Sequence, residues 1–276
     1  MKLVNKTRVS KSIPRKLIRE GRIYLLPLYF IMQLSHLARE GIENSGSHEF
    51  ADHIYKSIPQ GKFGVGIILD KILLSLPSSR SFRNRYIHSR DQIVKYAIKN
   101  SESELNILSV PSGIPRELVE AAVILRNDRP EVFNRIHFYC LDTDPVAHSK
   151  AKILAQEFHL ENFMFIPGDA FLKENYSVKF DVIVSTGFGE FLTDAQLSKF
   201  YEICFHALKE GGIFVSAATL RHKLSDYLMR HIAELLTQYR EEEKLLELLK
   251  KTSFVETKLA RDSVGYQVFI RAEKKV

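Results

Sequence analysis

Cysteine is scarce in this 276-residue chain, which holds only Cys140 and Cys204. Both lie in apolar stretches, so we interpret them as small buried hydrophobic residues rather than as a disulfide or as metal ligands. So low a content excludes a disulfide-stapled scaffold and favours a reducing, cytoplasmic compartment. The sequence predicts no metal site.

The chain also lacks an apolar run long enough to cross a bilayer. The segment from Ile23 to Leu37 is apolar but contains Pro27, Gln33, Ser35 and His36. It falls short of the roughly 20 residues that a membrane span requires. It has no small-residue cleavage site, so we do not expect a secretory signal. A helix of the N-terminal cap is the favoured interpretation, and a helix lying on a membrane surface is the alternative.

Outside the first 22 residues the chain has no net charge. The whole chain carries a formal charge of +7, and residues 1–22 alone account for it with eight basic residues against Glu20. Such an arm can contact RNA phosphates or anionic lipid, although a solvated, partly disordered arm is the simpler interpretation. The basic residues are Lys2, Lys6, Arg8, Lys11, Arg15, Lys16, Arg19 and Arg22.

Residues 1–100 show helical patterning and no strand-like alternation. Apolar residues recur every three or four positions in Ser47 to Ile58, Gly66 to Leu76 and Ser79 to Ile98. No internal repeat and no low-complexity tract interrupts this pattern. We therefore expect a helical N-terminal cap over residues 1–100 that contributes the substrate site, followed by a second domain over residues 101–276.

After Asn100, short apolar runs alternate with amphipathic stretches of helix length. The runs are nearly all apolar, as is typical of parallel strands that are covered on both faces. Alternation of this kind predicts an α/β, Rossmann-like sheet. The expected strands are Leu105–Val110, Ile136–Leu141, Phe163–Ile166, Phe180–Val184 and Gly212–Ala217, and the helices between them are Pro115–Arg126, Pro145–Phe158 and Thr193–Leu208.

The C-terminal part departs from this alternation. We expect one long helix over Leu224 to Lys251, then strands at Phe254–Leu259 and Tyr266–Arg271. The connection between these strands is too short for a parallel crossover, so they must pair antiparallel. The prediction is a seven-stranded sheet with an antiparallel C-terminal strand pair. Thr193 and Gln196 predict a capping box, and Gly211 with Gly212 a glycine cap at the end of that helix.

Candidate binding residues follow the strands, because open α/β sheets bind ligands at the carboxyl ends of their strands. Gly113 allows the backbone to approach a ligand closely, and the helix that follows offers N–H groups to an anion. Asp142 stands where an acid can accept both ribose hydroxyls of a nucleoside. Asp169 can accept a hydrogen bond from an exocyclic amine. Turn or capping roles are the alternatives for these residues, and Asp144 before Pro145 is explained as a helix N-cap.

Over residues 103–272 the chain resembles class I S-adenosylmethionine-dependent methyltransferases. The segments that carry the resemblance are Leu105–Arg116, Leu141–Pro145, Gly168–Ala170, Phe180–Val184 and Leu208–Val215. More narrowly, Gly64–Asp70, Phe82–Arg85 and Gly187–Leu192 are similar to poorly characterised bacterial methyltransferases with a helical N-terminal cap. The resemblance implies S-adenosyl-L-methionine as cofactor, held by Ser109, Pro111, Gly113, Asp142, Thr143, Asp169, Ala170, Ser185 and Gly187.

The first loop departs from the pattern of the family. Ser109 stands in place of the usual acid, and Pro111 and Pro115 replace two of the three glycines. Proline removes an N–H group and fixes φ, so the methionine end of the cofactor is expected to be held differently. A catalytically weak, methyltransferase-like binding protein is therefore one alternative function. A nicotinamide dehydrogenase is disfavoured because Gly-x-Gly-x-x-Gly is missing.

Methyl transfer to a small-molecule or lipid-like acceptor is the function that the resemblance implies. An RNA methyltransferase that uses the basic N-terminal arm is the second alternative, and peripheral membrane contact is compatible with either. Glu190 and His222 are the candidate catalytic residues, needed as bases only if the acceptor must lose a proton. The candidate substrate-binding residues are Tyr55, Arg83, Arg85, Tyr239 and Arg240. Arg83 and Arg85 could instead pair with acids such as Asp70.

Overall fold

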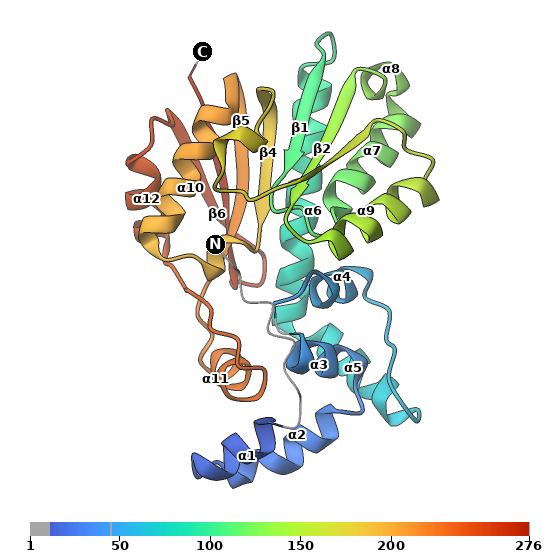
Figure 1. Cartoon of the computed structure of the whole chain (residues 1–276), viewed down its shortest axis with the longest axis vertical. Helices are drawn as coiled ribbons and strands as arrows, with labels where there is room; N and C mark the ends of the chain where they lie inside the picture. The colour runs from blue at the N-terminus through green and yellow to red at the C-terminus, as the bar shows by residue number, and fades with distance from the viewer. Residues whose placement is uncertain (1–11, 45, 276) are drawn as a thin grey trace. The chain divides into compact units, whose positions relative to one another are not determined.

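The computed structural model describes residues 12–44 and 46–275 (Figure 1). The chain divides into two compact units, and each is described by itself. The helical unit comprises the described part of Met1–Arg83 together with Arg221–Thr237, and the sheet unit comprises Asn84–Leu220 and Gln238–Val276. The division falls within helix α6 (Pro77–Lys99). In the basic arm, Lys2, Lys6, Arg8 and Lys11 lie outside the described residues, while Arg15, Lys16 and Arg19 belong to helix α1 (Ser12–Arg19).

A seven-stranded sheet with the order β3-β2-β1-β4-β5-β7-β6 forms the sheet unit. Strands β1 to β5 pair parallel, and β7 pairs antiparallel with both β5 and β6. The predicted α/β sheet with an antiparallel C-terminal strand pair is thus confirmed. The strands are β1 (Leu105–Ser109), β2 (Ile136–Asp142), β3 (Phe163–Pro167), β4 (Phe180–Thr186), β5 (Leu208–Thr219), β6 (Glu256–Arg261) and β7 (Gln267–Glu273).

Helices cover both faces of this sheet, which explains why its central strands β1 and β4 are buried along nearly their whole length. One face packs against the C-terminal part of α6 and against α7 (Arg116–Asp128) and α9 (Pro145–Glu157). The other packs against α10 (Asp194–Ala207) and α12 (Glu242–Lys250) (Figure 1). Neighbouring residues of one strand point to opposite faces: Ile107 lies in the first apolar core and Leu108 in the second. A short helix, α8 (Pro130–Phe133), precedes β2.

The helical unit is built from short helices around two small apolar clusters. Asp70 stands at its centre, with no exposed surface. Its carboxylate accepts hydrogen bonds from the Ser35 hydroxyl and from the N–H groups of Leu37 and Gln60, the last at 2.8 Å. Asp70 therefore links its own helix by hydrogen bonds to the segment of Ser35 and Leu37 and to the segment of Gln60. The helices are α1, η1 (Ile23–Leu25), α2 (Leu26–Met32), α3 (His36–Glu43), α4 (His48–Lys56), α5 (Val65–Ser75), the first turns of α6, and α11 (Lys223–Ile232).

Two local predictions near the C-terminal half were wrong. The single helix expected over Leu224 to Lys251 is in fact α11 and α12, separated by residues 233–241 without helical structure. The expected glycine cap of α10 does not form either, because the helix ends at Ala207 and strand β5 begins at once with Leu208. Gly211, with φ of 74°, lies instead where the register between β4 and β5 shifts.

Other local predictions hold. Thr193 and Gln196 form the predicted capping box at the start of α10, and Asp144 caps α9 by accepting from the N–H of Val146. Cys140 and Cys204 are free and buried, and burial raises the pKa of both thiols well above the ordinary value. Among the described helices, none combines the length and hydropathy required to cross a bilayer.

Candidate functional site

From β1 the chain adds β2 and β3 on one side of the sheet and then β4 and β5 on the other, so the strand order reverses between β1 and β4. A ligand crevice is expected at the carboxyl ends of these two strands. The predicted cofactor residues come from the loops that leave this edge. Ser109 ends β1, Asp142 ends β2, Asp169 follows β3, and Ser185 lies near the end of β4. Four loops that are far apart in the sequence therefore start from one edge of the sheet.

Asp142 joins three of these segments. Its Oδ2 accepts a hydrogen bond from the Gly113 N–H at 2.7 Å, and its Oδ1 accepts one from the Asp144 N–H at 2.9 Å. Its backbone carbonyl accepts from the N–H of Gly168 at 2.9 Å. A carboxylate has about four lone-pair sites, so two hydrogen bonds leave room for two ligand hydroxyls. The arrangement is compatible with the role expected for Asp142, and it places Gly113 and Gly168 beside this residue.

The loop after β1 carries features that suit a bound ligand. Gly113 has φ of 51°, a region that a residue with a side chain rarely adopts. The hydroxyl of Ser112 is buried and, among the described residues, has no hydrogen-bond partner. A buried hydroxyl without a partner is costly, so a ligand group that pairs with it would be stabilised. Ser112 was not among the predicted residues, and nothing in its sequence context distinguishes it from a turn serine.

The start of helix α7 offers fewer free donors than expected. The N–H of Arg116 donates to the carbonyl of Ile114, and those of Leu118 and Val119 donate to the carbonyl of Pro115. The side chain of Glu117 adds a carboxylate to the same turn. Three N–H groups at this helix start are thus already engaged within the turn, so the turn is not an open site for an anion.

Ser109, expected at the cofactor, donates its hydroxyl hydrogen to Glu117 Oε1 at 2.7 Å. Glu117 is buried, and burial raises the pKa of its carboxyl group, opposed by the hydrogen bond from Ser109. The predictions missed Glu117. One signal was available, because this acid lies between apolar positions on the buried side of a helix that includes Leu118 and Ala121. A buried acid from α7 thus contacts the serine that ends β1.

We expect Glu117→Gln to stabilise the protein at neutral pH by about 1 kcal/mol. The raised pKa means that folding favours the protonated form of Glu117. The contribution of this proton to the free energy of unfolding is complete at pH values below the ordinary pKa of a glutamate. It is lost as the pH rises through the raised pKa that Glu117 has in the folded protein. Urea unfolding at several pH values should therefore show the advantage of the variant shrinking in acid. An advantage that did not depend on pH would contradict this explanation.

The loop after β3 is closed by its own contacts. Asp169 Oδ1 accepts a hydrogen bond from the Phe171 N–H at 2.9 Å. Asn175 donates to the carbonyl of Asp169, and the Tyr176 hydroxyl donates to that of Ala170 at 2.7 Å. The capping alternative for Asp169 is therefore realised, and its contact with an exocyclic amine stays a prediction. Ala170 is buried beneath this loop, and Thr143 is exposed in the loop after β2.

After β4, the structure brings together two residues that were assigned to different roles. The Arg85 guanidinium, on α6, donates to Glu190 Oε1 at 3.1 Å, and both side chains are almost fully buried. The guanidinium also lies over Gly187, where an added Cβ would stand 2.8 Å from Arg85 Nη2. Gly187 has φ of 82°, so both space and backbone conformation favour glycine here. The acid that pairs with Arg85 is thus Glu190, whereas Asp70 is held within the helical unit.

Two residues that the predictions missed complete this cluster. The hydroxyl of Thr219, at the end of β5, donates to Glu190 Oε1, and the Gln267 side-chain amide donates to Thr219 Oγ1 at 2.8 Å. Gln267 is fully buried, and its Oε1 has no hydrogen-bond partner within the described part of the chain. Polar residues at the ends of two neighbouring strands were the available signal. One connected cluster is thus formed by Arg85, Glu190, Thr219 and Gln267.

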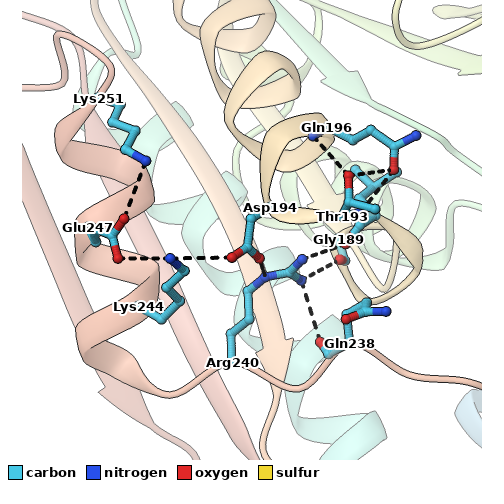
Figure 2. A network of polar contacts seen from close by, with 10 residues as sticks. Gly189, Thr193, Asp194, Gln196, Gln238, Arg240, Lys244, Glu247 and Lys251 are labelled. Carbon is cyan, nitrogen blue, oxygen red and sulfur yellow. Dashed lines mark hydrogen bonds and ion pairs between the residues drawn. The ribbon is translucent and has the colours of Figure 1, made fainter.

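Arg240 also contacts the loop after β4 (Figure 2). Its guanidinium donates to Asp194 at 2.9 Å, to the carbonyl of Gly189 at 2.8 Å and to the carbonyl of Leu192. The hydrogen bond from Arg240 holds the pKa of Asp194 below its ordinary value. Arg240 was expected to bind substrate, but these contacts favour a positioning role, in which it shapes the loop around Glu190.

Arg240→Ala is expected to lower the free energy of unfolding by about 2–4 kcal/mol, because it leaves buried carbonyls without donors. The pKa of Asp194 should rise at the same time. Lys244→Ala is the matched control: Lys244 contacts the same Asp194 at 3.3 Å, but its side chain is 38% exposed. That variant should lose less than about 1 kcal/mol. Equal losses in the two variants would argue against a special role for Arg240.

The remaining predicted residues lie in other parts of the chain. His222 caps α11, where its Nδ1 accepts from the N–H of Ser225. Tyr55 packs against an apolar cluster of the helical unit, and Arg83 donates to the carbonyl of Leu74 at 2.9 Å. These three residues belong to the helical unit, whereas Glu190 and Tyr239 belong to the sheet unit. Tyr239 is half-buried in the segment between α11 and α12.

Comparison with known proteins identifies the fold and one domain. A family model described as a methyltransferase domain matches residues 101–263, which is more than half of the chain. No curated protein matches the sequence. The matched region contains the four loops at the carboxyl edge, from Ser109 to Glu190, together with the strands that position them.

Several solved structures share the fold at low sequence identity. A possible exported protein from Bordetella parapertussis has a TM-score of 0.78 and 16% identity, with 100% of both chains covered. Magnesium protoporphyrin IX methyltransferase from Synechocystis PCC 6803, with bound SAH, has a TM-score of 0.53 and 13% identity, covering 72% of this chain and 87% of that one. A methyltransferase from Clostridium acetobutylicum ATCC 824 has a TM-score of 0.52 and 14% identity, covering 69% and 92%.

Proposed function

The chain belongs to the methyltransferase domain family, and from this premise we propose that its methyl acceptor is a small molecule or a lipid-like compound. It is an S-adenosylmethionine-dependent methyltransferase; the proposal concerns the acceptor and the residues that act on it. The single observation that carries the assignment of the site is the position of Asp142, whose carboxylate and carbonyl hold the loops after β1 and β3 at one corner of the sheet.

The residues present at this corner fit a bound nucleoside. Asp142 keeps lone pairs for ribose hydroxyls, Ser112 offers a buried hydroxyl, and the backbone at Gly113 has a positive φ that favours glycine. Asp169 would accept from the adenine amine. The rest of the cofactor site would be lined by Ser185, Gly187 and Pro111. When S-adenosylmethionine is bound, the chemistry that it supplies is an activated methyl group on a sulfonium.

In our proposal Glu190 is the general base. Methyl transfer breaks the bond from carbon to sulfur and forms a bond from carbon to the acceptor atom. An acceptor hydroxyl or ammonium must lose a proton, which Glu190 would receive. Arg85 and Thr219 both donate to Oε1 of Glu190, so this oxygen is held in place. The main contribution of the protein is alignment, which lowers barriers by about 7–11 kcal/mol in favourable cases. His222, which belongs to the helical unit, stays a second candidate base.

The compartment is also part of the proposal. The two cysteines are free and buried, so the fold needs no oxidising environment to form a disulfide. Their raised thiol pKa values would also make them slow to react with oxidants. We place the enzyme in the cytoplasm on that ground.

Two measurements test the proposed function. Calorimetric titration with S-adenosylmethionine and S-adenosylhomocysteine should show binding of both at one site. A methyl-labelled cofactor incubated with separated fractions of small metabolites, lipids and RNA should then transfer label to the metabolite or lipid fraction. Label in RNA would contradict the proposed acceptor, and binding without any transfer would favour the catalytically weak alternative.

A further inference from the structure

Helix α5 presents a row of apolar residues to solvent. Its buried residues are Gly66, Asp70 and Leu74, spaced four residues apart on one face. On the opposite face, Val65 is 53%, Ile68 is 59% and Ile72 is 52% exposed. The surface helix of a globular protein normally shows the reverse distribution. Val65, Ile68, Ile72 and the adjoining Leu76 are called the outer face of α5.

The inward face cannot be exchanged for the outer one. A Cβ on Gly66 would stand 2.1 Å from the carbonyl oxygen of Leu34, so only glycine permits this close contact. Asp70 is held by hydrogen bonds from Ser35, Leu37 and Gln60. These contacts determine the orientation of α5 about its axis. The exposure of the outer face is therefore built into the helical unit.

The chain before α5 extends the apolar surface. Phe63 has φ of 55°, a conformation that is unusual for a bulky residue, and its side chain is 85% exposed. Ile58 is 54% exposed in the preceding loop. A strained backbone that holds an aromatic ring in water points to an interaction surface.

The surroundings of the outer face are basic. From His53 to Arg83 the only acidic residue is Asp70, which is buried, whereas Lys62 and Lys71 are exposed. Residues 1–83 and 221–237 hold 17 basic and 8 acidic residues, a formal charge of +9. The rest of the chain therefore carries −2 of the total of +7. Apolar residues flanked by lysines are typical of helices that lie in a membrane interface.

We propose that the outer face of α5, with Phe63, docks on an anionic lipid surface. Apolar side chains would enter the boundary between headgroups and acyl chains, and Lys62 and Lys71 would meet lipid phosphates. With 11 residues, α5 is about 16 Å long, too short to span the bilayer, so it would lie along the surface. This goes beyond methyl transfer and does not depend on it, although it would bring a lipid-like acceptor close to the enzyme.

Charge favours lipid over a second copy of the chain. In a symmetric dimer through this face, Lys62 and Lys71 of both copies would approach one another, and the buried Asp70 is the only acid between His53 and Arg83. The outer face also offers few hydrogen-bonding groups, which a specific protein interface normally contains. An anionic bilayer would instead pair its phosphates with the lysines and accept the apolar side chains without needing hydrogen bonds from them.

Co-sedimentation of the full chain with vesicles tests the proposal. Wild type should bind vesicles of equal parts phosphatidylglycerol and phosphatidylcholine, and bind poorly to pure phosphatidylcholine. Ile68→Asp/Ile72→Asp should weaken binding about tenfold or more. Val146→Asp/Ile153→Asp, on α9 of the sheet unit, is the matched control, with exposures of 52% and 54%. It should bind as wild type does. Lys62→Glu/Lys71→Glu alters only exposed lysines and should also weaken binding to the anionic vesicles.

A fluorescent probe reports the location directly, because the chain contains no tryptophan. Phe63→Trp should shift its emission to shorter wavelength on anionic vesicles and be quenched by brominated lipid, whereas Phe158→Trp on the sheet unit should not. Failure of wild type to bind, or unchanged binding of both the aspartate and the glutamate variants, would overturn the proposal. So would a dimer, seen by analytical ultracentrifugation, that Ile72→Asp dissociates. Cofactor titration of each variant separates these outcomes from a failure of the proposed function.

Discussion

Asp142→Ala is expected to weaken binding of S-adenosylmethionine by at least about 100-fold. Two hydrogen bonds from ribose hydroxyls to a carboxylate are each worth about 1.5–3 kcal/mol, and each 1.4 kcal/mol is a factor of ten. The substitution also removes the acceptor of the Gly113 N–H, which frees the loop after β1. Calorimetric titration measures the change in dissociation constant, and Asp142→Asn, which keeps the shape, should lose less.

Asp181→Ala provides the matched control for Asp142→Ala. Asp181 is also buried, 7% exposed against 9%, and its Oδ2 accepts a hydrogen bond from the Asn106 N–H at 2.7 Å. It lies at the start of β4, however, at the opposite edge of the sheet from the four loops. The control should lose stability and retain cofactor binding. Equal weakening of binding in both variants would mean that Asp142 acts only through folding.

Much of the sheet unit could be predicted because its signals are local. Apolar runs of strand length separated by amphipathic helices determine a parallel sheet, and a short connection determines the antiparallel end. That Asp142 and Gly113 lie close together could be predicted for the same reason. The carboxyl ends of parallel strands share one edge, so position along the chain predicts position in space.

Contacts between distant segments escaped prediction. The pair of Arg85 and Glu190 joins residues that are 105 positions apart, and no local pattern links them. The break between α11 and α12 arises in the same way, because Gln238 donates its N–H to the carbonyl of Glu190 and Arg240 binds the same loop. These tertiary contacts override a helical periodicity that continues through the segment. Glu242 and Glu243 in the first turn of α12 were a signal that a new helix begins.

Breaking the pair of Arg85 and Glu190 should cost about 3–5 kcal/mol of unfolding free energy for either single substitution, Arg85→Met or Glu190→Gln. Their side chains are 5% and 7% exposed, so each loss leaves the partner buried without its counter-charge. Urea unfolding of the two variants gives the measurement. Arg90→Met is the control on the same helix, since Arg90 pairs with Glu120 at 3.2 Å with 24% and 34% exposure. That pair should contribute less than about 1 kcal/mol.

The double variant Arg85→Met/Glu190→Gln measures how strongly the two residues stabilise each other. If the cost of each single change is mainly an unpaired buried charge, the double variant should lose about 2–3 kcal/mol less than the two losses added together. It should still bind the cofactor, because Asp142 and the first loop are intact, but it should transfer methyl groups poorly to an acceptor that must lose a proton. Additive losses would mean that the two residues stabilise the fold independently, and full activity would remove Glu190 from the proposed mechanism.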